Sequence, residues 1–591
     1  MNLTRYFHTL RHLRPIQISG RLWHRMNPAK PNLSAAPSLR QPSGAWSISA
    51  DRPASMLAAD FFRFLNHVGQ VRRAADWNDS AQVKLWLYNL HYFDDLNAVA
   101  AVDRGDWHRA LLARWVAENP PGLGNGWEPY PTSLRIVNWI KWSLAGNTLE
   151  PAWVQSLAVQ ARWLRRHIEW HLLGNHLFVN AKALVLAGLF FAGDEADEWL
   201  AQGLKILGRE VPEQVLPDGG HFELSPMYHA IILEDFLDLL NVAGAWPGQV
   251  PDPVVAQWRE VAVRMLHWLE AMIHPDGGIA FFNDSALGIA PEFAALAAYA
   301  ERLGVEAAGI RGGNSGVVIA SVAKQSRAFA DAEPPGSPRR FAPRDDGEGP
   351  LRLARDGELF GARCTHFVDS GYVRLEQGNA VVLLDVARIG PDYLPGHAHA
   401  DTLSFELSLF GQRVLVNTGT SQYGLGAERL RQRGTAAHST VEVDGVDSSK
   451  VWGGFRVAQR ARPFGLAITD EDQGLKVICA HDGYRRLKGK SIHRRRWWLA
   501  EHSLQVSDCI EGEFRVAVAR YYLHPTVQVT GQGQAGQFIL PAGQIVKWSV
   551  AGGFARVVPA TWHPEFGLTV PSQCVEIQFE GAEVAMDFSW K

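Results

Sequence analysis

The chain of 591 residues has few of the features that would place it at once in a functional class. Its 4 cysteines are widely spaced and form no C-x-x-C pair, which argues against a disulfide framework and a thiolate zinc site. No apolar run approaches the length of about 18 residues that a membrane span requires. The 58 basic and 61 acidic residues leave a formal charge of −3, so we expect no nucleic-acid partner held by a strong positive field.

The amino-terminal stretch MNLTRYFHTLRHLRPIQISGRLWHR is basic and aromatic, but it lacks the continuous apolar core and small-residue cleavage site of a secretory signal. We therefore expect a cytoplasmic location, with a periplasmic or envelope-associated location as the alternative. Tryptophan, by contrast, is abundant. The 22 tryptophans suit sites that stack on sugars, although most of them should belong to the core.

Residues 81–315 form a succession of helix-length segments in which apolar side chains recur three and four positions apart. Short breakers such as NPPGLGNG and LPDGG separate these segments. The alternation favours stacked helical hairpins, either as a solenoid or as a closed α/α toroid. Residues 1–80 are expected to wrap on this body as helix and extended chain, and the Pro- and charge-rich residues 316–350 to serve as a linker.

Residues 351–591 carry β-strand signals, including GYVRLEQ, LSFELSLF and STVEVDG. Their alternation of apolar and polar residues predicts antiparallel strands with one wet face, and so a large β-sandwich. The expected fold class is therefore α+β multidomain, a helical domain followed by an antiparallel β-sandwich. A binding cleft is expected where the two domains meet.

The stretch LPDGGHFELSPMYH concentrates chemistry in fourteen residues. Asp218 and the two glycines after it predict a tight turn that presents His221, and Glu223 follows shortly. Ser225 and the proline after it predict the start of a helix, which places Tyr228 in the first turn. Side chains at such a junction point into a cavity while the helix fixes their position. The alternative for Tyr228 is a half-buried core tyrosine with a satisfied hydroxyl.

Two other stretches place imidazoles beside polar groups. Asn175 and His176 stand at a predicted helix start, where they either aim at one ligand or act as a capping asparagine beside a packed histidine. His397 and His399 alternate along an extended segment and therefore face the same side. With His438 they could converge on one metal or one substrate. The alternative is a set of hydrogen-bonded histidines on the rim of a sheet.

Further side chains would line the same substrate site or form ordinary ion pairs. Two of them, Arg135 and Asn138, are three residues apart and share one helix face. Arginines are natural partners of sugar carboxylates because the guanidinium fork binds in a bidentate manner. The predicted substrate-binding set is Trp127, Glu128, Tyr130, Arg135, Asn138, His221, Glu223, Tyr423 and Arg433.

Four motifs, GNHLF, DGGHFELSPMYH, GHAHADTLSFEL and RGTAAHSTVEVDG, together resemble the heparinase II/III family of polysaccharide lyases over residues 80–510. The resemblance implies an incomplete α/α toroid followed by β-sandwich layers, and β-elimination at a uronic acid of an acidic polysaccharide. It implies that Asn175 neutralises the substrate carboxylate and that His176 lies near the reacting carbon. Tyr228 would be the catalytic phenol and His397 the histidine on the sheet side.

Removing a proton next to a carboxylate builds negative charge on that group, so donors aimed at it lower the barrier. Tyr228 acts as the base only if its phenolate is stabilised, because an ordinary tyrosine has a pKa of about 10. If base and leaving group lie on opposite faces of the ring, His176 is the base and Tyr228 the acid. One rival is a glycoside hydrolase that uses Glu223 and a second carboxylate such as Glu128. Another is a non-catalytic glycan-binding or assembly protein.

The same resemblance implies a structural metal held by a histidine, an aspartate and a second histidine, at His399, position 417 and His438. This chain has Asn417 instead, and an amide oxygen is a poorer ligand than a carboxylate for a divalent ion. We therefore expect that no cofactor is required and that the three side chains form a hydrogen-bonded cluster. A bound zinc or calcium ion is the alternative.

Overall fold

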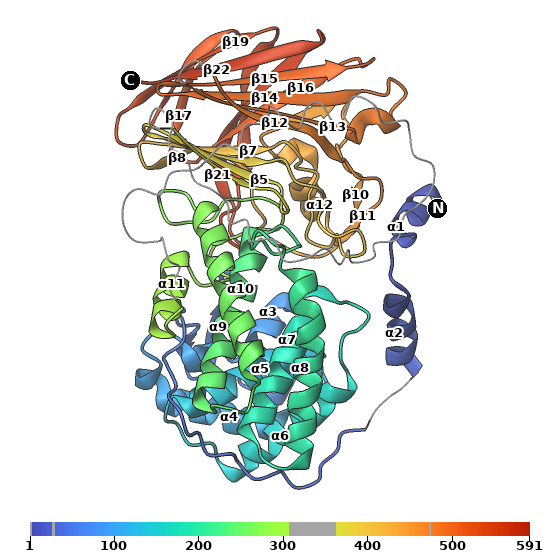
Figure 1. The fold of residues 1–591 in the computed structure, drawn as a ribbon, viewed down its shortest axis with the longest axis vertical. Coiled ribbons are helices and arrows are strands. Elements are labelled where there is room, and N and C mark those ends of the chain that lie inside the picture. The colour runs from blue at the N-terminus through green and yellow to red at the C-terminus, as the bar shows by residue number, and fades with distance from the viewer. Residues whose placement is uncertain (1–2, 27–29, 306–361, 472–473) are drawn as a thin grey trace.

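The computed structural model describes residues 3–26, 30–305, 362–471 and 474–591. Helices gather at one end of the molecule and two layers of sheet at the other, with the helices of the amino-terminal segment standing along one side (Figure 1). The expected α+β fold is therefore confirmed. The predicted linker, residues 316–350, lies outside the described residues.

The helical domain is an incomplete α/α toroid of antiparallel hairpins. Four of its helices have proline in the first turn, where the missing N–H costs no hydrogen bond. Short 3-10 turns occur at η1 (Ala74–Asn78), η2 (Asp94–Asn97), η3 (Ala101–Arg104) and η4 (Asn125–Trp127). The helices are α3 (Lys84–Tyr92), α4 (Gly105–Glu118), α5 (Pro129–Leu144), α6 (Pro151–Arg166), α7 (Gly174–Phe190), α8 (Asp194–Gln214), α9 (Pro226–Ala245), α10 (Asp252–Ala271) and α11 (Phe293–Arg302).

Helices α7 and α9 form the centre of the toroid and are buried on nearly all sides. Their charged residues pair with each other in the interior. Lys182 on α7 contacts Asp235 at 2.6 Å and Asp238 at 2.7 Å, and Lys141 on α5 contacts Asp238 at 2.9 Å. Buried charges are tolerated when they are paired in this way, so this network fixes the two central helices relative to α5.

The amino-terminal segment contains α1 (Leu3–Leu10) and α2 (Pro15–Met26), followed by extended chain along the toroid. The backbone N–H of Arg40 donates to the carbonyl of Phe190, and that of Ser43 to the carbonyl of Ala245. These contacts agree with the expected wrap. This segment also contains a three-stranded antiparallel sheet that the sequence did not predict, made of β1 (Met56–Ala58), β2 (Phe61–Phe64) and β3 (His67–Gln70).

The sandwich contains two large antiparallel sheets. The smaller elements of this domain are a two-stranded ribbon of β10 (Val451–Trp452) and β11 (Arg456–Val457), the helix α12 (Ala427–Arg433), and the 3-10 turns η6 (Thr435–Ala437) and η7 (Gly483–Arg486). The sheet nearer the toroid consists of β4 (Ala362–Phe367), β5 (Tyr372–Gln377), β6 (Ala380–Asp385), β7 (Phe405–Leu409), β8 (Gln412–Val416), β9 (Val441–Val443), β16 (Ala517–Leu523), β20 (Phe554–Trp562) and β21 (Val570–Phe579). The outer sheet consists of β12 (Pro463–Glu471), β13 (Gly474–His481), β14 (Ile492–Ala500), β15 (Ser503–Glu511), β17 (Gln528–Gln532), β18 (Ala535–Ile539), β19 (Ile545–Ala551) and β22 (Glu583–Ser589).

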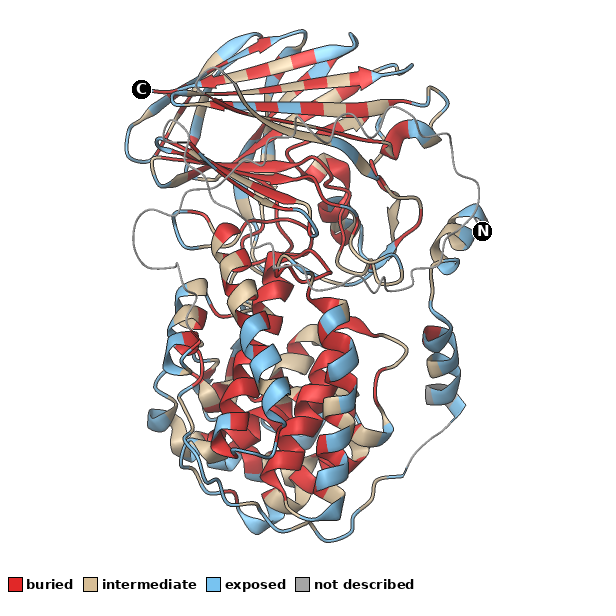
Figure 2. Ribbon diagram, viewed as in Figure 1, coloured by how far each residue is buried: buried red, intermediate tan, exposed pale blue. Residues whose placement is uncertain are grey.

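The central strands β6, β7 and β8 of the inner sheet are buried on both faces, whereas the outer sheet alternates buried and more exposed residues (Figure 2). The prediction of one wet face was therefore wrong for the strand LSFELSLF. Its polar residues Glu406 and Ser408 face the toroid, where His274 lies 2.7 Å from the carboxylate and 2.8 Å from the hydroxyl. The helical domain replaces water on that face.

Two similar turns, LPDGG and HPDGG, attach the toroid to the inner sheet. Asp218 in the first accepts hydrogen bonds from the backbone N–H groups of Asp369 and Ser370, in the turn between β4 and β5. Asp276 in the second forms an ion pair with Arg413 on β8 at 2.7 Å. The repeated aspartates hold the two domains together, and this fixes the junction at which the site lies.

Candidate active site

Three helices of the toroid begin at the junction, and each carries a polar or aromatic side chain in its first turn. Tyr130 lies at the start of α5, Asn175 and His176 at the start of α7, and Tyr228 at the start of α9. Helix amino termini present unpaired N–H groups and the positive end of the helix dipole. The junction is therefore suited to an anionic ligand.

The turns that precede these helix starts have unusual backbone geometry. Leu173, before α7, and Leu224, before α9, have φ values of 66° and 59°, and Asn283 in the loop between α10 and α11 has a φ of 56°. Such left-handed conformations cost about 1–3 kcal/mol for residues with a side chain. At α9 the strain is accompanied by a cap, since Ser225 Oγ accepts from the N–H of Tyr228 at 3.2 Å and donates to the carbonyl of Asp284 at 2.5 Å.

Tyr228 meets the sheet domain directly. Its hydroxyl lies 2.9 Å from the hydroxyl of Tyr423, and its ring centroid is 3.9 Å from that of His397. Burial raises the pKa of the Tyr228 phenol well above its usual value near 10, and the neighbouring Tyr423 adds to the shift. The phenol is therefore held in its protonated form.

Asp284, between α10 and α11, is the hub of the site. Its carboxylate pairs with both terminal nitrogens of Arg429, accepts from His397 Nδ1 at 2.9 Å and contacts His399 Nε2 at 2.8 Å. Burial alone would raise the pKa of Asp284, but the charge of Arg429 and these hydrogen bonds hold it well below its usual range. The predicted common orientation of the two histidines is confirmed, and their shared partner is this carboxylate.

Glu223 connects the toroid side of the site with His397. One carboxylate oxygen lies 3.5 Å from the backbone nitrogen of Asn175, and the other lies 3.5 Å from His397 Nε2. Burial raises the pKa of Glu223 more than these neighbours lower it. The second oxygen of Glu223 and Oδ1 of Asn175 are buried without a hydrogen-bond partner among the described residues. Buried polar atoms without a partner require an explanation, and here a ligand that supplies the missing hydrogen bonds would give one.

Space around Glu223 is limited. Gly174 has a φ of 55°, and a Cβ at this position would lie 2.8 Å from a Glu223 oxygen and 2.4 Å from the Leu394 side chain. The helix start of α7 therefore requires glycine for both its conformation and its close approach.

His176 forms a second pair with a carboxylate. Its Nδ1 lies 3.2 Å from a Glu169 oxygen, and its ring centroid is 4.5 Å from that of Tyr130. Burial lowers the pKa of His176, but the charge and hydrogen bond of Glu169 raise it further, with a net rise above 6.5. A third of the His176 side chain is exposed, whereas its Nδ1 is buried.

Three residues predicted to bind substrate lie in the toroid core instead. Arg135 is completely buried, bonds to Gln160 and lies 3.8 Å over the ring of Trp115. Asn138 donates to the carbonyl of Tyr92 at 2.9 Å and to a carboxylate oxygen of Asp94 at 2.7 Å. The shared helix face of the two residues is real, but it packs inward. Trp127 is buried among other aromatic rings.

His221 and Arg433 were also predicted to bind substrate, and the structure places both in the interior. The turn does not present His221 to a ligand, because its side chain is fully buried with Nε2 3.4 Å from Gln214. Arg433 is fully buried and donates to the carbonyls of Ala398 and Gly454. Glu128 is partly exposed and contacts Lys84 and Tyr88.

The sequence missed two functional candidates, Asp284 and Glu169, and offered a third, Arg429, without selecting it. Asp284 follows a buried apolar segment in FFNDSALG, and only its polar neighbours could have drawn attention to it. Arg429 is one of three arginines in ERLRQR, and the sequence favoured Arg433 without a physical reason to separate them. The structure selects Arg429 because its guanidinium lies 4.9 Å from the ring of Tyr423.

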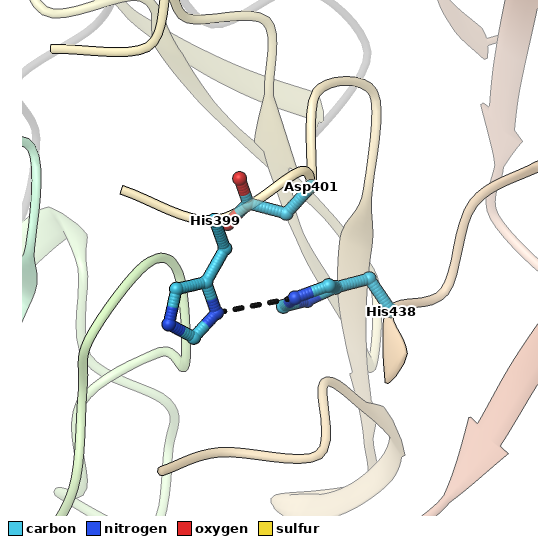
Figure 3. A group of neighbouring side chains, drawn as sticks. All are labelled: His399, Asp401 and His438. Carbon is cyan, nitrogen blue, oxygen red and sulfur yellow. Dashed lines mark hydrogen bonds between the residues drawn. The ribbon is translucent and has the colours of Figure 1, made fainter. Parts of the chain in front are cut away.

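The predicted metal ligands were His399, Asn417 and His438, and the structure replaces Asn417 with Asp401. His399 Nδ1 and His438 Nε2 lie 3.2 Å apart, and the nearby carboxylate belongs to Asp401 (Figure 3). Potential ligand atoms of these three buried residues all lie within 4.8 Å of one another. Asn417 instead donates to Ser404 and accepts from a backbone N–H, so its amide fixes the backbone. Two imidazoles and a carboxylate fit a divalent ion such as zinc.

Comparison with known proteins agrees with this architecture. The model of the heparinase II/III amino-terminal domain matches residues 110–300, and that of the heparinase II/III-like carboxy-terminal domain matches residues 361–591. The chain belongs to the heparinase II/III family. Among the described residues of this family member, no helix is long and apolar enough to cross a membrane.

A heparin-sulfate lyase of Bacteroides stercoris is 22% identical over 376 residues, which cover 62% of this chain and 48% of the relative. A heparin-sulfate lyase of Pedobacter heparinus is 32% identical over 136 residues, 21% of this chain and 20% of the relative. The chain thus spans half or less of the length of these relatives. A crystal structure of heparinase III aligns with a TM-score of 0.65 at 16% identity, covering 98% of this chain and 85% of the other.

Proposed function

We propose that this protein is a polysaccharide lyase that cleaves an acidic, uronate-containing glycan by β-elimination. The observation that carries the proposal is the contact between Tyr228 and His397, which joins a helix start to the sheet domain with a ring distance of 3.9 Å. Unfilled buried oxygens on Asn175 and Glu223 lie beside it. Family membership and the printed names of the relatives, heparin-sulfate lyases, support the same reaction class.

Binding of the uronate carboxylate would take place at the start of α7. The raised pKa of Glu223 favours its uncharged form, which reduces repulsion of an acidic sugar. The amide of Asn175 and the helix terminus supply hydrogen bonds to the carboxylate, which gains negative charge as the neighbouring proton leaves. Asp284 and Arg429 neutralise each other, so their role is to orient His397 and the tyrosines rather than to bind substrate.

The acid and the base follow from the environments of Tyr228 and His176. Tyr228 keeps its proton and is suited to donate it to the leaving glycosidic oxygen. His176 has Glu169 on one ring nitrogen, an arrangement that stabilises the imidazolium formed when the other nitrogen removes the C5 proton. The bond from the glycosidic oxygen to C4 breaks as the C4–C5 double bond forms. The product is a 4,5-unsaturated uronate.

A divalent ion would be held by His399, Asp401 and His438, and it would supply a structural cross-link between the segment that carries His397 and the chain before β9. No reaction step requires it. Metal analysis of the purified protein and of the Asp401→Asn variant tests this proposal. Bound zinc that is lost in the variant would support it, and a metal-free wild-type protein would contradict it.

The function is tested by incubating the protein with a panel of acidic polysaccharides, both sulfated and unsulfated, and recording ultraviolet absorbance. A rise in absorbance signals the unsaturated product. New reducing ends without absorbance would show hydrolysis, and binding without cleavage would show a glycan-binding protein. Either result would refute the lyase proposal.

A further inference from the structure

The outward face of helix α2 is apolar. Ile18, Leu22 and Met26 are spaced four residues apart and therefore form one stripe along the helix. Their exposed fractions are 52%, 58% and 75%, and Trp23 beside them is 64% exposed. Soluble helices normally turn such a stripe toward the core. Figure 2 shows this helix standing at the side of the molecule with much of its surface exposed.

The face of α2 that contacts the body is small and polar. Gln17 is 2% exposed and donates to the carbonyl of Tyr393 at 3.2 Å. Gly20 approaches His171 so closely that a Cβ would lie 3.1 Å from its backbone nitrogen. The helix is thus attached by its polar side, and its apolar side is left without a partner among the described residues.

Helix α1 repeats this arrangement. Thr9 accepts a hydrogen bond from the indole of Trp452 at 3.1 Å, and Tyr6 packs edge-on against the same indole at 5.1 Å. Phe7 and Leu10 are more than half exposed on the other side. Helix α1 therefore attaches to the sandwich domain, and α2 attaches to the loop of Tyr393 and to the toroid loop of His171. Both helices present bulky apolar groups to solvent.

The same segment is strongly basic in a chain whose overall charge is −3. Residues 1–50 contain no aspartate or glutamate, while Arg11 and Arg21 are exposed on or beside the two helices. The basic residues in this range are Arg5, Arg11, Arg14, Arg21, Arg25, Lys30 and Arg40.

We propose that α1 and α2 bind the surface of a membrane that contains anionic phospholipids. Apolar and aromatic groups flanked by arginine are the combination that lies in the headgroup region, where the side chains enter the acyl boundary and the cations meet lipid phosphates. An acidic polysaccharide would match the charges but leave the apolar stripe uncovered. A second copy of this segment would bring like charges together.

The test is flotation of the full-length protein with vesicles of phosphatidylcholine alone and with added phosphatidylglycerol. The test variant is Ile18→Gln/Leu22→Gln/Trp23→Gln, whose three side chains are exposed and make no contribution to the core. The matched control is Val102→Gln/Leu123→Gln/Ile545→Gln, which removes three exposed apolar groups elsewhere. Thermal unfolding and lyase assays on soluble polymer verify that each variant is folded.

We expect wild-type protein to float with the anionic vesicles, the test variant to bind at least tenfold more weakly, and the control to bind like wild type. Added salt should weaken binding, since exposed charges are screened. Failure of wild-type protein to float, or equal flotation of the test variant, would overturn the proposal. Sedimentation that shows a wild-type dimer split by the test variant would overturn it as well, because a second copy would then cover the stripe.

Discussion

Two parts of this molecule contain the same chain of side-chain contacts, in which an arginine pairs with an aspartate, the aspartate contacts a histidine, and that histidine contacts a second one. In the sandwich, Arg495 pairs with Asp508, which accepts from His493 at 2.7 Å, and His493 lies 3.2 Å from His481. At the junction, Arg429 pairs with Asp284, which contacts His399 at 2.8 Å, and His399 lies 3.2 Å from His438.

The difference lies in what surrounds each set. The other terminal nitrogen of Arg495 donates to the carbonyls of Leu403 and Ser439, and all four side chains of the sandwich set are buried. Asp284 accepts a further hydrogen bond from His397, whose side chain is 14% exposed and stacks on Tyr228. A charged network by itself is therefore structural. It becomes part of a site where it orients a partly exposed group beside unfilled hydrogen-bonding atoms.

Replacing Tyr228 with Phe should have the largest effect at the junction. Loss of the proton donor is expected to reduce kcat by about 100-fold to 10,000-fold, with little change in stability. Steady-state kinetics on the cleaved polymer and chemical denaturation measure the two effects. Tyr423→Phe is the matched control, because it removes the hydrogen-bond partner of Tyr228 but leaves the donor itself. Equal losses in both variants would contradict a special role for Tyr228.

Replacing Asp508 with Asn, in the sandwich, should have the opposite effect, a large loss of stability with little change in kcat. It leaves the buried guanidinium of Arg495 without its carboxylate, which is expected to cost about 3–5 kcal/mol of stability. Denaturant titration measures the loss. Activity per folded molecule should stay near the wild-type value, and a large fall in kcat would show that this set, too, takes part in the reaction.

Asn175→Ala tests the carboxylate site. Removal of one donor to the developing charge is expected to lower kcat by about 100-fold to 1,000-fold. The side chain makes no hydrogen bond through Oδ1 with the described residues, so stability should change little. A variant that loses binding of the polymer but keeps kcat would place Asn175 in ground-state binding only.

Glu169→Gln should have the smallest effect, a shift in pH dependence. His176 must be unprotonated to act as the base, so kcat/KM should rise with pH as the imidazole titrates. Glu169 holds the pKa of His176 above 6.5, and its removal should move this rising limb to lower pH. An unchanged limb would exclude His176 as the titrating base.

The order of the two domains and the helix starts near Asn175 and Tyr228 could be predicted, because apolar periodicity, a proline and the Ser225 cap are local signals. Asn175 itself does not cap α7, whose N-cap is Leu173. The partners of the site residues could not be predicted. Tyr423 reaches Tyr228 across the domain junction, and Asp284 reaches His397 across it. No local pattern records a contact between segments so far apart in the chain. The same limit explains why Arg135 was wrongly predicted to bind substrate. Its helix face was predicted correctly, but tertiary packing decides that this face meets Trp115.

The central claim is that cleavage at the junction is an elimination that depends on Tyr228. The most direct measurement is the ratio of unsaturated uronate to new reducing ends in digests by wild-type and Tyr228→Phe protein. The account predicts about one unsaturated uronate for each new reducing end with wild type, and almost no product of either kind with the variant. Reducing ends without unsaturation, or equal product from both proteins, would contradict it.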